Sequence, residues 1–535
     1  MPSRRLPLLF GLVCCVLSVS LSACRSADDA FCGTAGCEFS KGEWTRLQSL
    51  ANLPDPLPDS SNRYVGNPAA IFLGQKWYFD ARFSGNATQL DTLKRATQYA
   101  RAPKGQPTNL SCASCHNPQR GGSDDTSSPG NVSIGAGEYD VRSQKTLNSA
   151  YYSLTYWNGR NDSLWAQILA VNESFVSMNS TRLHDAWTIN DHYVSDYTQI
   201  FSDYPWPLTG SSKDLPQTSD GFGQCATVAG ACPAPCRAVT STGNPATGEP
   251  SHNTCWPRFP ANGKPGAIPG CQAGDLAGTT GPSAEPFNDA FDCMDSADKT
   301  LVNRIYVNWA KAIAAYEYTL LSRNASFDRF INEGSQSGQI SDAAKRGARL
   351  FVGKASCIDC HNTPLLSDNL FHNIGVPQIG PGVPTESDCP AGGSCDCVNG
   401  KNCLPWGAYD GLKKLQANSF RRDSIYSDSV ADRSRASFYT APLTDDLKGA
   451  WRTPGLRDVA LTAPYMHNGV IRSLEEVIWH YDKVGSADNM SGTRDVRLHP
   501  LELTDQEQTD LVEFLRTLTG EPLSSSVTGA PVLPL

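Results

Sequence analysis

The chain has 535 residues, of which 39% are apolar and 19% are charged, and its formal net charge is -9. This length and composition predict a folded protein with more than one hydrophobic core and exclude a disordered chain. The acidic balance argues against nucleic acid as a partner and favours a basic one.

The first 23 residues have the pattern of an export signal. Two arginines precede an apolar run over residues 6–21, which is too short to span a membrane, and small residues follow it. The Leu-Ser-Ala-Cys ending resembles a bacterial lipoprotein box, in which Cys24 would be lipidated; ordinary cleavage without a lipid is the alternative. We therefore expect a periplasmic or cell-envelope protein, with a lipid anchor in the outer membrane if Cys24 is modified.

Residues 24–62 are predicted to be a proline-containing tether, and the first helix is expected after Asn67 and Pro68. An N-terminal domain is assigned to residues 63–335 and a C-terminal domain to residues 336–520, with a tail over 521–535. A helix with one apolar face is expected over residues 301–320, and the last helix begins at the capping box of Thr504 and Glu507.

Two irregular stretches rich in Pro, Gly and Cys, at about 205–297 and 376–446, are interpreted as insertions. Nineteen cysteines are present, and twelve remain when the two of the leader, Cys24 and the four of the two Cys-x-x-Cys-His motifs described next are set aside. They form even local groups, as disulfides in an oxidising compartment require. These groups are Cys32 and Cys37; Cys225, Cys232, Cys236, Cys255, Cys271 and Cys293; and Cys389, Cys395, Cys397 and Cys403.

Each predicted domain carries one Cys-x-x-Cys-His motif. Two thiols at this spacing form thioethers with the vinyl groups of a haem, and the adjacent His ligates the iron. A redox dithiol would not need the His, and a zinc site would need further paired ligands. The motifs predict two covalent c-type haems, attached at Cys112, Cys115 and His116, and at Cys357, Cys360 and His361.

The sixth ligand of each iron decides the function, because a filled position passes electrons and an open one can bind peroxide. Spacing alone does not settle which residue fills either position. The remaining candidates are seven histidines and a few methionines, and a lone His is more often a structural residue than a ligand.

Three segments resemble the bacterial di-haem cytochrome c peroxidase family, including its branch with the di-haem enzyme that matures methylamine dehydrogenase. They are residues 73–85 (LGQKWYFDARFSG), 156–167 (YWNGRNDSLWAQ) and 451–470 (WRTPGLRDVALTAPYMHNGV). The resemblance implies a mainly α-helical fold, in which two cytochrome c-like haem domains face each other and the disulfide-rich insertions lie outside them.

By this resemblance, Trp157 lies between the haems as a relay and Gln167 lines the peroxide pocket of the first haem. From the sequence alone, a core aromatic is the simpler reading of Trp157. Peroxide cleavage needs a group that moves a proton, and family members carry a Glu ten residues after the Gln. That place holds Ser177 here, so Glu173 is the hypothesised proton-transfer residue, with a surface role as the alternative.

Two further departures concern the sixth ligands. Many members have a distal His in a Ser-Ile-Gly-His context, where this chain has Ala136, which predicts an open first haem in the resting protein. The place of the second haem's distal Met holds Tyr481, as in the maturing branch, so Tyr481 is the candidate ligand and His480 its competitor. A calcium ion between the domains is also implied, held by carbonyls of Thr462 and Pro464, although Ser143 replaces the usual Asn.

The sequence thus predicts a peroxidase that reduces hydrogen peroxide with electrons from a small redox protein. A maturation oxidase acting on Trp or Tyr of a partner protein is one alternative. A non-enzymatic electron-transfer cytochrome is the other, and there His184 or Met178 would fill the open position.

Overall fold

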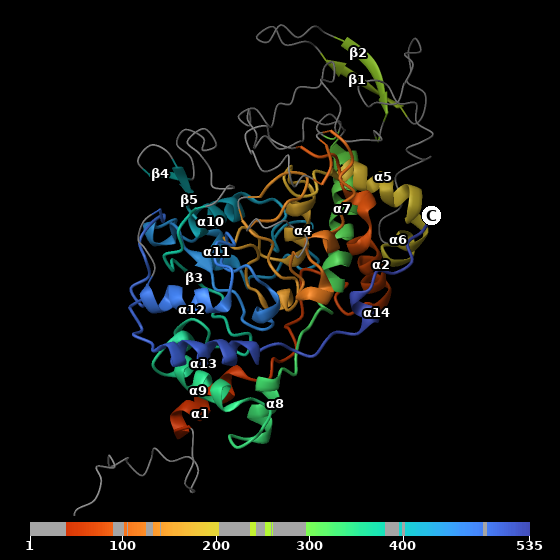
Figure 1. The fold of residues 1–535 in the computed structure, drawn as a ribbon. Coiled ribbons are helices and arrows are strands. Elements are labelled where there is room, and N and C mark those ends of the chain that lie inside the picture. Colours follow the sequence, from red (N-terminus) through yellow and green to blue (C-terminus); the bar gives the residue numbers. More distant parts are fainter. Residues whose placement is uncertain are drawn as a thin grey trace, which may run out of the picture.

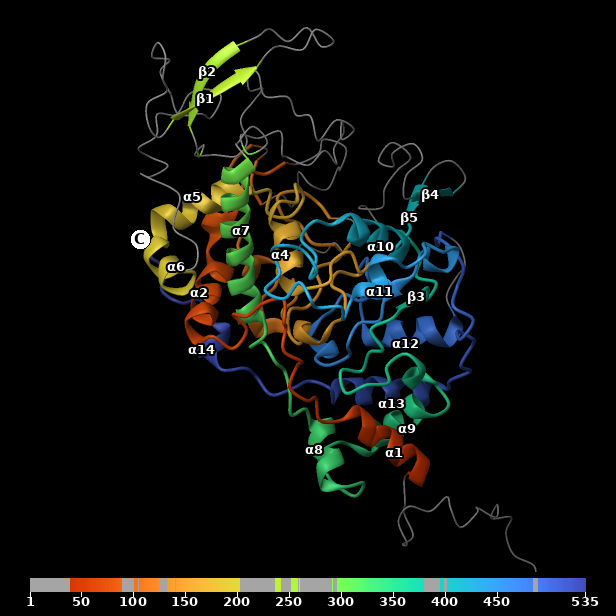
Figure 2. The same cartoon turned by 180° about the vertical axis from the view of Figure 1, so that it is seen from behind.

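The computed structural model describes residues 39–535 apart from 89–100, 104, 125–131, 140, 203–235, 242–251, 258, 260–290, 292–295, 380–394, 399–401 and 485–488. The described part is mainly helical, as predicted, and its helices gather in two groups (Figures 1 and 2). The export signal, Cys24 and five of the ten cysteines of the two insertions lie outside the described residues. No described helix is long and apolar enough to span a membrane.

The first group encloses the core of the N-terminal domain. The long helix α7 (Ser296–Glu317) packs against α2 (Pro68–Phe79) and α4 (Leu164–Asn172), with α5 (Arg182–His192) and α6 (Val194–Ile200) at one side. Asn67 caps α2 through its side chain and Pro68 occupies the first turn, as predicted. Gly74 permits the closest approach, because a Cβ there would lie 1.9 Å from the carbonyl oxygen of Ala312 in α7.

The second group encloses the core of the C-terminal domain, where α9 (Asp342–Val352) packs against α13 (Asp505–Arg516). Thr504 and Glu507 form the predicted capping box of α13. Helices α12 (Leu474–Lys483) and α8 (Ser326–Glu333) complete this group. Phe327 and Phe330 of α8 are buried in the second core, so the domain boundary lies before residue 326 and not at 335 as expected.

The remaining elements are short. The described ranges contain three antiparallel two-stranded sheets, which pair β1 (Cys236–Ser241) with β2 (His252–Pro257), β3 (Phe371–His372) with β6 (Trp451–Arg452), and β4 (Cys395–Val398) with β5 (Asn402–Pro405). The single-turn helices are η1 (Ala81–Phe83), η2 (Cys112–Ser114), η3 (Pro118–Arg120), η4 (Ser149–Tyr151), η6 (Cys357–Asp359), η8 (Asp445–Leu447) and η9 (Val459–Leu461).

The two ends of the chain are exchanged between the domains. The expected tether contains α1 (Lys41–Leu50), which is capped by Ser40 and buries Trp44 against Phe330 of the C-terminal core, with ring centroids 5.4 Å apart. The expected tail contains α14 (Ser525–Thr528) and lies on the N-terminal domain, where Gln75 Nε2 donates to the carbonyl of Ser526 at 2.8 Å. Neither segment is a free linker, because each has apolar or hydrogen-bonding groups that the opposite domain covers.

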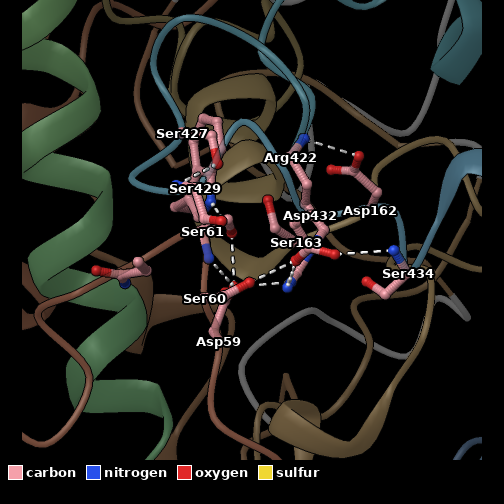
Figure 3. Close-up of polar contacts among 12 residues, drawn as sticks. Asp59, Ser60, Ser61, Asp162, Ser163, Arg422, Ser427, Ser429, Asp432 and Ser434 are labelled. Atoms are coloured by element: carbon pink, nitrogen blue, oxygen red, sulfur yellow. Dashed lines mark hydrogen bonds and ion pairs between the residues drawn. The ribbon is translucent and has the colours of Figure 1, made fainter.

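The described part of residues 376–446 also differs from expectation. It contains α10 (Ala408–Ala417) and α11 (Ala436–Tyr439) and packs on the N-terminal domain instead of lying outside it. Figure 3 shows how Arg422 joins the segments: its guanidinium pairs with Asp59 at 2.8 Å and with Asp432 at 2.5 Å. Its backbone N–H donates to Asp162 at 3.0 Å. This buried cluster ties the second insertion to the start of the N-terminal domain.

Candidate active site at two cavities beside the cysteine motifs

The first Cys-x-x-Cys-His motif opens onto a cavity of about 960 Å³ in the N-terminal domain, part of it open to solvent. Cys112, Cys115 and His116 all line it. Tyr78 donates from its hydroxyl to the His116 carbonyl at 2.6 Å, and Nδ1 of His116 lies 3.3 Å from the Gly122 carbonyl oxygen. A second contact of this kind orients a metal-ligating imidazole and leaves its other nitrogen for the metal.

The second motif opens onto a larger cavity of about 1420 Å³, lined by Cys357, Cys360 and His361. Nδ1 of His361 lies 2.6 Å from the carbonyl oxygen of Leu366, so the two motif histidines are held in the same way. In both domains the motif forms a single helical turn, η2 or η6, which places its two thiols on one wall of the cavity.

These residues fit covalent haem. Burial raises the pKa of Cys115 and of Cys357 to about 12, which disfavours the thiolate form at both positions. Each cavity is also lined by a tryptophan whose buried indole N–H has no hydrogen-bond partner among the described residues, Trp309 in the first and Trp451 in the second. A group that fills the cavity and carries acceptors would satisfy both donors.

Trp157 is the residue that the described linings of the two cavities share. Its indole N–H donates to the Arg142 carbonyl at 2.8 Å, and its own carbonyl accepts from Arg452 N–H at 2.8 Å. The following Gly159 has a φ of +76° and packs against Phe371, so the turn that presents Trp157 is fixed by contacts with both domains.

The structure brings Gln167 to the first cavity but not Glu173. Gln167 lines the cavity from α4, and Ser177 and Met178 line it from the segment that follows this helix. The Glu173 carboxylate faces Arg182, with oxygens 2.7 Å from Nε and 2.6 Å from Nη2, and it is not part of the described lining. Both oxygens of this carboxylate are engaged by the forked guanidinium of Arg182. The structure therefore does not bring the Glu173 carboxylate to the first cavity.

Glu317 is the carboxylic acid that lines the first cavity. It ends α7, its side chain is 6% exposed, and no described residue donates to its carboxyl group. Burial alone raises the pKa of Glu317 to about 8, so the acid is largely protonated at neutral pH. The sequence held a signal for it, because Glu317 continues the four-residue spacing of Trp309 and Ile313 along the apolar face of this helix.

The structure distinguishes the residues that could supply a sixth ligand at the first motif. Ala136 is buried where many family members have a His, and His184 is turned away, with Nε2 2.8 Å from the Arg82 carbonyl oxygen. Met178 is the exception among these candidates, because it is buried and lines the first cavity.

Tyr481 lines the second cavity from α12, and burial raises the pKa of its phenol. Its neighbour His480 is directed elsewhere, with Nε2 2.9 Å from the Ile374 carbonyl oxygen. His467 also lines the second cavity and stacks on Trp451 with ring centroids 3.9 Å apart. Burial lowers the pKa of His467 to about 3, which keeps its imidazole neutral.

A third cavity of about 520 Å³ lies between the other two and is lined by Ser143, Thr462 and Pro464, the residues expected around calcium. It is lined by Arg142 and Lys145 as well, and Arg142 Nη1 donates to the Pro464 carbonyl at 2.5 Å. One of the expected calcium ligands is therefore already engaged by a cation.

The chain is similar to known proteins over most of its length. Residues 68–217 match the family described as di-haem cytochrome c peroxidase. Cytochrome-c peroxidase IdrP1 of Pseudomonas sp. (strain SCT) is 25% identical over 97% of this chain and 95% of its own. Methylamine utilization protein MauG of Methylorubrum extorquens is 24% identical over 98% of this chain and 97% of its own.

A solved structure of a MauG-like protein associated with microbial copper homeostasis has the same fold. The TM-score is 0.51 at 19% identity, over 90% of this chain and 97% of that one. With two motif-bearing cavities in two helical domains, and with relatives named as peroxidases along nearly its whole length, the chain is a peroxidase-like oxidoreductase similar to the di-haem cytochrome c peroxidase family.

Proposed function

We propose that the first cavity receives hydrogen peroxide and that the second passes electrons to it from an external redox protein. The observation that carries this proposal is that Trp157 lines both cavities. An aromatic side chain at that place supplies a relay between two redox groups without a change of fold. Haems attached at the two motifs would supply the iron that exchanges electrons with peroxide and donor.

The side chains of the first cavity are suited to peroxide. The Gln167 amide can hydrogen-bond a bound peroxide and orient it. The Glu317 carboxyl, protonated at neutral pH, can donate its proton to the oxygen that leaves as water. Ala136 brings no ligand to the cavity, which leaves space for a small molecule.

The resting protein and its reaction with peroxide test this function. Low-temperature electron paramagnetic resonance of the ferric protein is expected to show one high-spin and one low-spin haem, and both signals should fall after one equivalent of peroxide. In Trp157→Phe we expect the high-spin signal to fall and the low-spin signal to persist, because the relay is lost. Two low-spin haems that are indifferent to peroxide would refute the proposal.

A plain electron-transfer cytochrome is the second candidate, and Met178 is the observation that favours it, because a thioether could fill the sixth position. If it does, the wild type has two low-spin haems and Met178→Leu converts one to high spin. A maturation oxidase would share the peroxide chemistry. It would differ by oxidising Trp or Tyr residues of a partner protein, which mass spectrometry of the partner detects.

Tyr481 is proposed as the distal ligand of the second haem, because it lines that cavity while His480 is bonded elsewhere. A phenolate ligand stabilises ferric iron relative to ferrous iron. Tyr481→Phe is therefore expected to raise the reduction potential of that haem and to change its low-spin resonance. His480→Gln is the matched control and should leave both unchanged; a shift in the control alone would assign the ligand to His480.

A further inference from the structure

The cavity between the two motif cavities does not fit a calcium ion as it is built. Calcium takes six to eight oxygen ligands, and carboxylates usually supply part of them. No Asp or Glu is among the described residues that line this cavity. Its charged groups are instead two cations, Arg142 and Lys145, which would repel a divalent ion.

Both cations are bonded to backbone carbonyls across the domain interface. Arg142 belongs to the N-terminal domain, and its guanidinium donates to Pro464 of the C-terminal domain at 2.5 Å and to Ser123 Oγ at 2.8 Å. Lys145 donates from its ammonium to the carbonyls of Gly455 at 2.7 Å and of Arg457. These are the partners that a cation bound between the domains would take.

The same residues hold the relay. The carbonyl of Arg142 accepts a hydrogen bond from the indole N–H of Trp157. The backbone N–H of Arg142 donates to the His467 carbonyl at 2.8 Å. Trp157 itself lines the cavity that contains the two cations. The backbone of Arg142 therefore joins the indole of Trp157 to the C-terminal domain, while its side chain holds Pro464 of the same domain.

The geometry points to a calcium-independent domain interface, in which Lys145 and Arg142 supply in side chains the positive charge that a bound calcium would otherwise supply. Ser143 is consistent with this assignment. Its hydroxyl side chain is shorter than the Asn amide expected at this position, so it extends less far toward a bound divalent ion. These interface contacts do not depend on any reaction with peroxide.

The test uses the di-haem protein after treatment with chelator. Isothermal titration with calcium chloride is expected to show no binding, and calcium at millimolar concentration should leave Tm unchanged. Lys145→Met keeps the aliphatic stem but leaves two buried carbonyls without their donor, so we expect Tm to fall by about 5 °C. Lys413→Met, at an exposed position in α10, is the matched control and should not change Tm.

Either of two results would overturn the inference. One is stoichiometric calcium binding by the wild type. The other is a Lys145→Met protein with the Tm of the wild type, since the ammonium would then bridge nothing. Neither readout depends on turnover, so a failure here is distinguishable from a failure of the peroxidase assignment.

Discussion

Replacing Glu317 by glutamine is expected to slow the bimolecular reaction with hydrogen peroxide by about 10²- to 10⁴-fold, the range for loss of a general acid. Gln keeps the shape of the side chain and its polarity but has no acidic proton. Stopped-flow absorbance of the haem band at increasing peroxide concentration measures the rate constant. Glu173→Gln is the control, because that carboxylate is paired with Arg182 outside the cavity, and its rate should stay close to that of the wild type.

The pH dependence gives this prediction a second readout. The acid must carry its proton, so the wild-type rate should fall as pH rises through about 8, the pKa of Glu317 in the folded protein. The raised pKa also means that the folded protein binds a proton which the unfolded chain has released above pH 4.5. Stability of the wild type relative to Glu317→Gln should therefore decline from about pH 4.5 to pH 8. A variant with full rate and an unchanged profile would remove Glu317 from the mechanism.

The largest loss of stability is expected from Asp328→Ala. Asp328 accepts from Arg457 Nη1 at 2.5 Å, and their side chains are 2% and 1% exposed. It also accepts from the N–H of Asn52, so the pair joins α8 to the end of α1. Removing one partner of a buried pair leaves the other charge uncompensated and costs about 3–5 kcal/mol.

Thermal unfolding of the di-haem protein, followed by circular dichroism, measures this loss, and we expect Tm to fall by about 10 °C. Glu513→Ala is the matched control. It breaks the exposed pair between Glu513 and Arg516, which is worth about 0–1 kcal/mol, and should shift Tm by about 2 °C or less. Equal shifts in both variants would contradict the assignment of Arg457 and Asp328 as a central support.

The sequence predicted those parts of the site that depend on short motifs. The motif cysteines and histidines line the two cavities, and Trp157 and Gln167, which the resemblance singled out, line them too. Glu317 was missed because it reaches the cavity by tertiary packing, about 200 residues after the first motif in the chain. Glu173 was chosen for its nearness in sequence to Gln167, but its partner Arg182 decides where it points.

The two ends of the chain show that a local sequence signal can predict a helix without predicting where the helix packs. Ser40 and Glu43 form a capping box, and Trp44, Leu47 and Leu50 follow at helical spacing, so a local signal for α1 was present. No local signal states which core such a helix covers. Residues 521–535 have no apolar periodicity at all, and their place depends on main-chain carbonyls of Ser526 and Val527, which accept hydrogen bonds from Gln75 and Tyr316.

The exchanged ends also decide when each half can finish folding during synthesis. Helix α1 emerges first but lies on a core that needs residues up to Leu518, and the N-terminal core lacks the cover of α14 until residues 525–528 have emerged. Neither half can close fully over its motif before almost the whole chain has been made. Each motif-bearing domain is therefore completed only when the opposite end of the chain is in place on it.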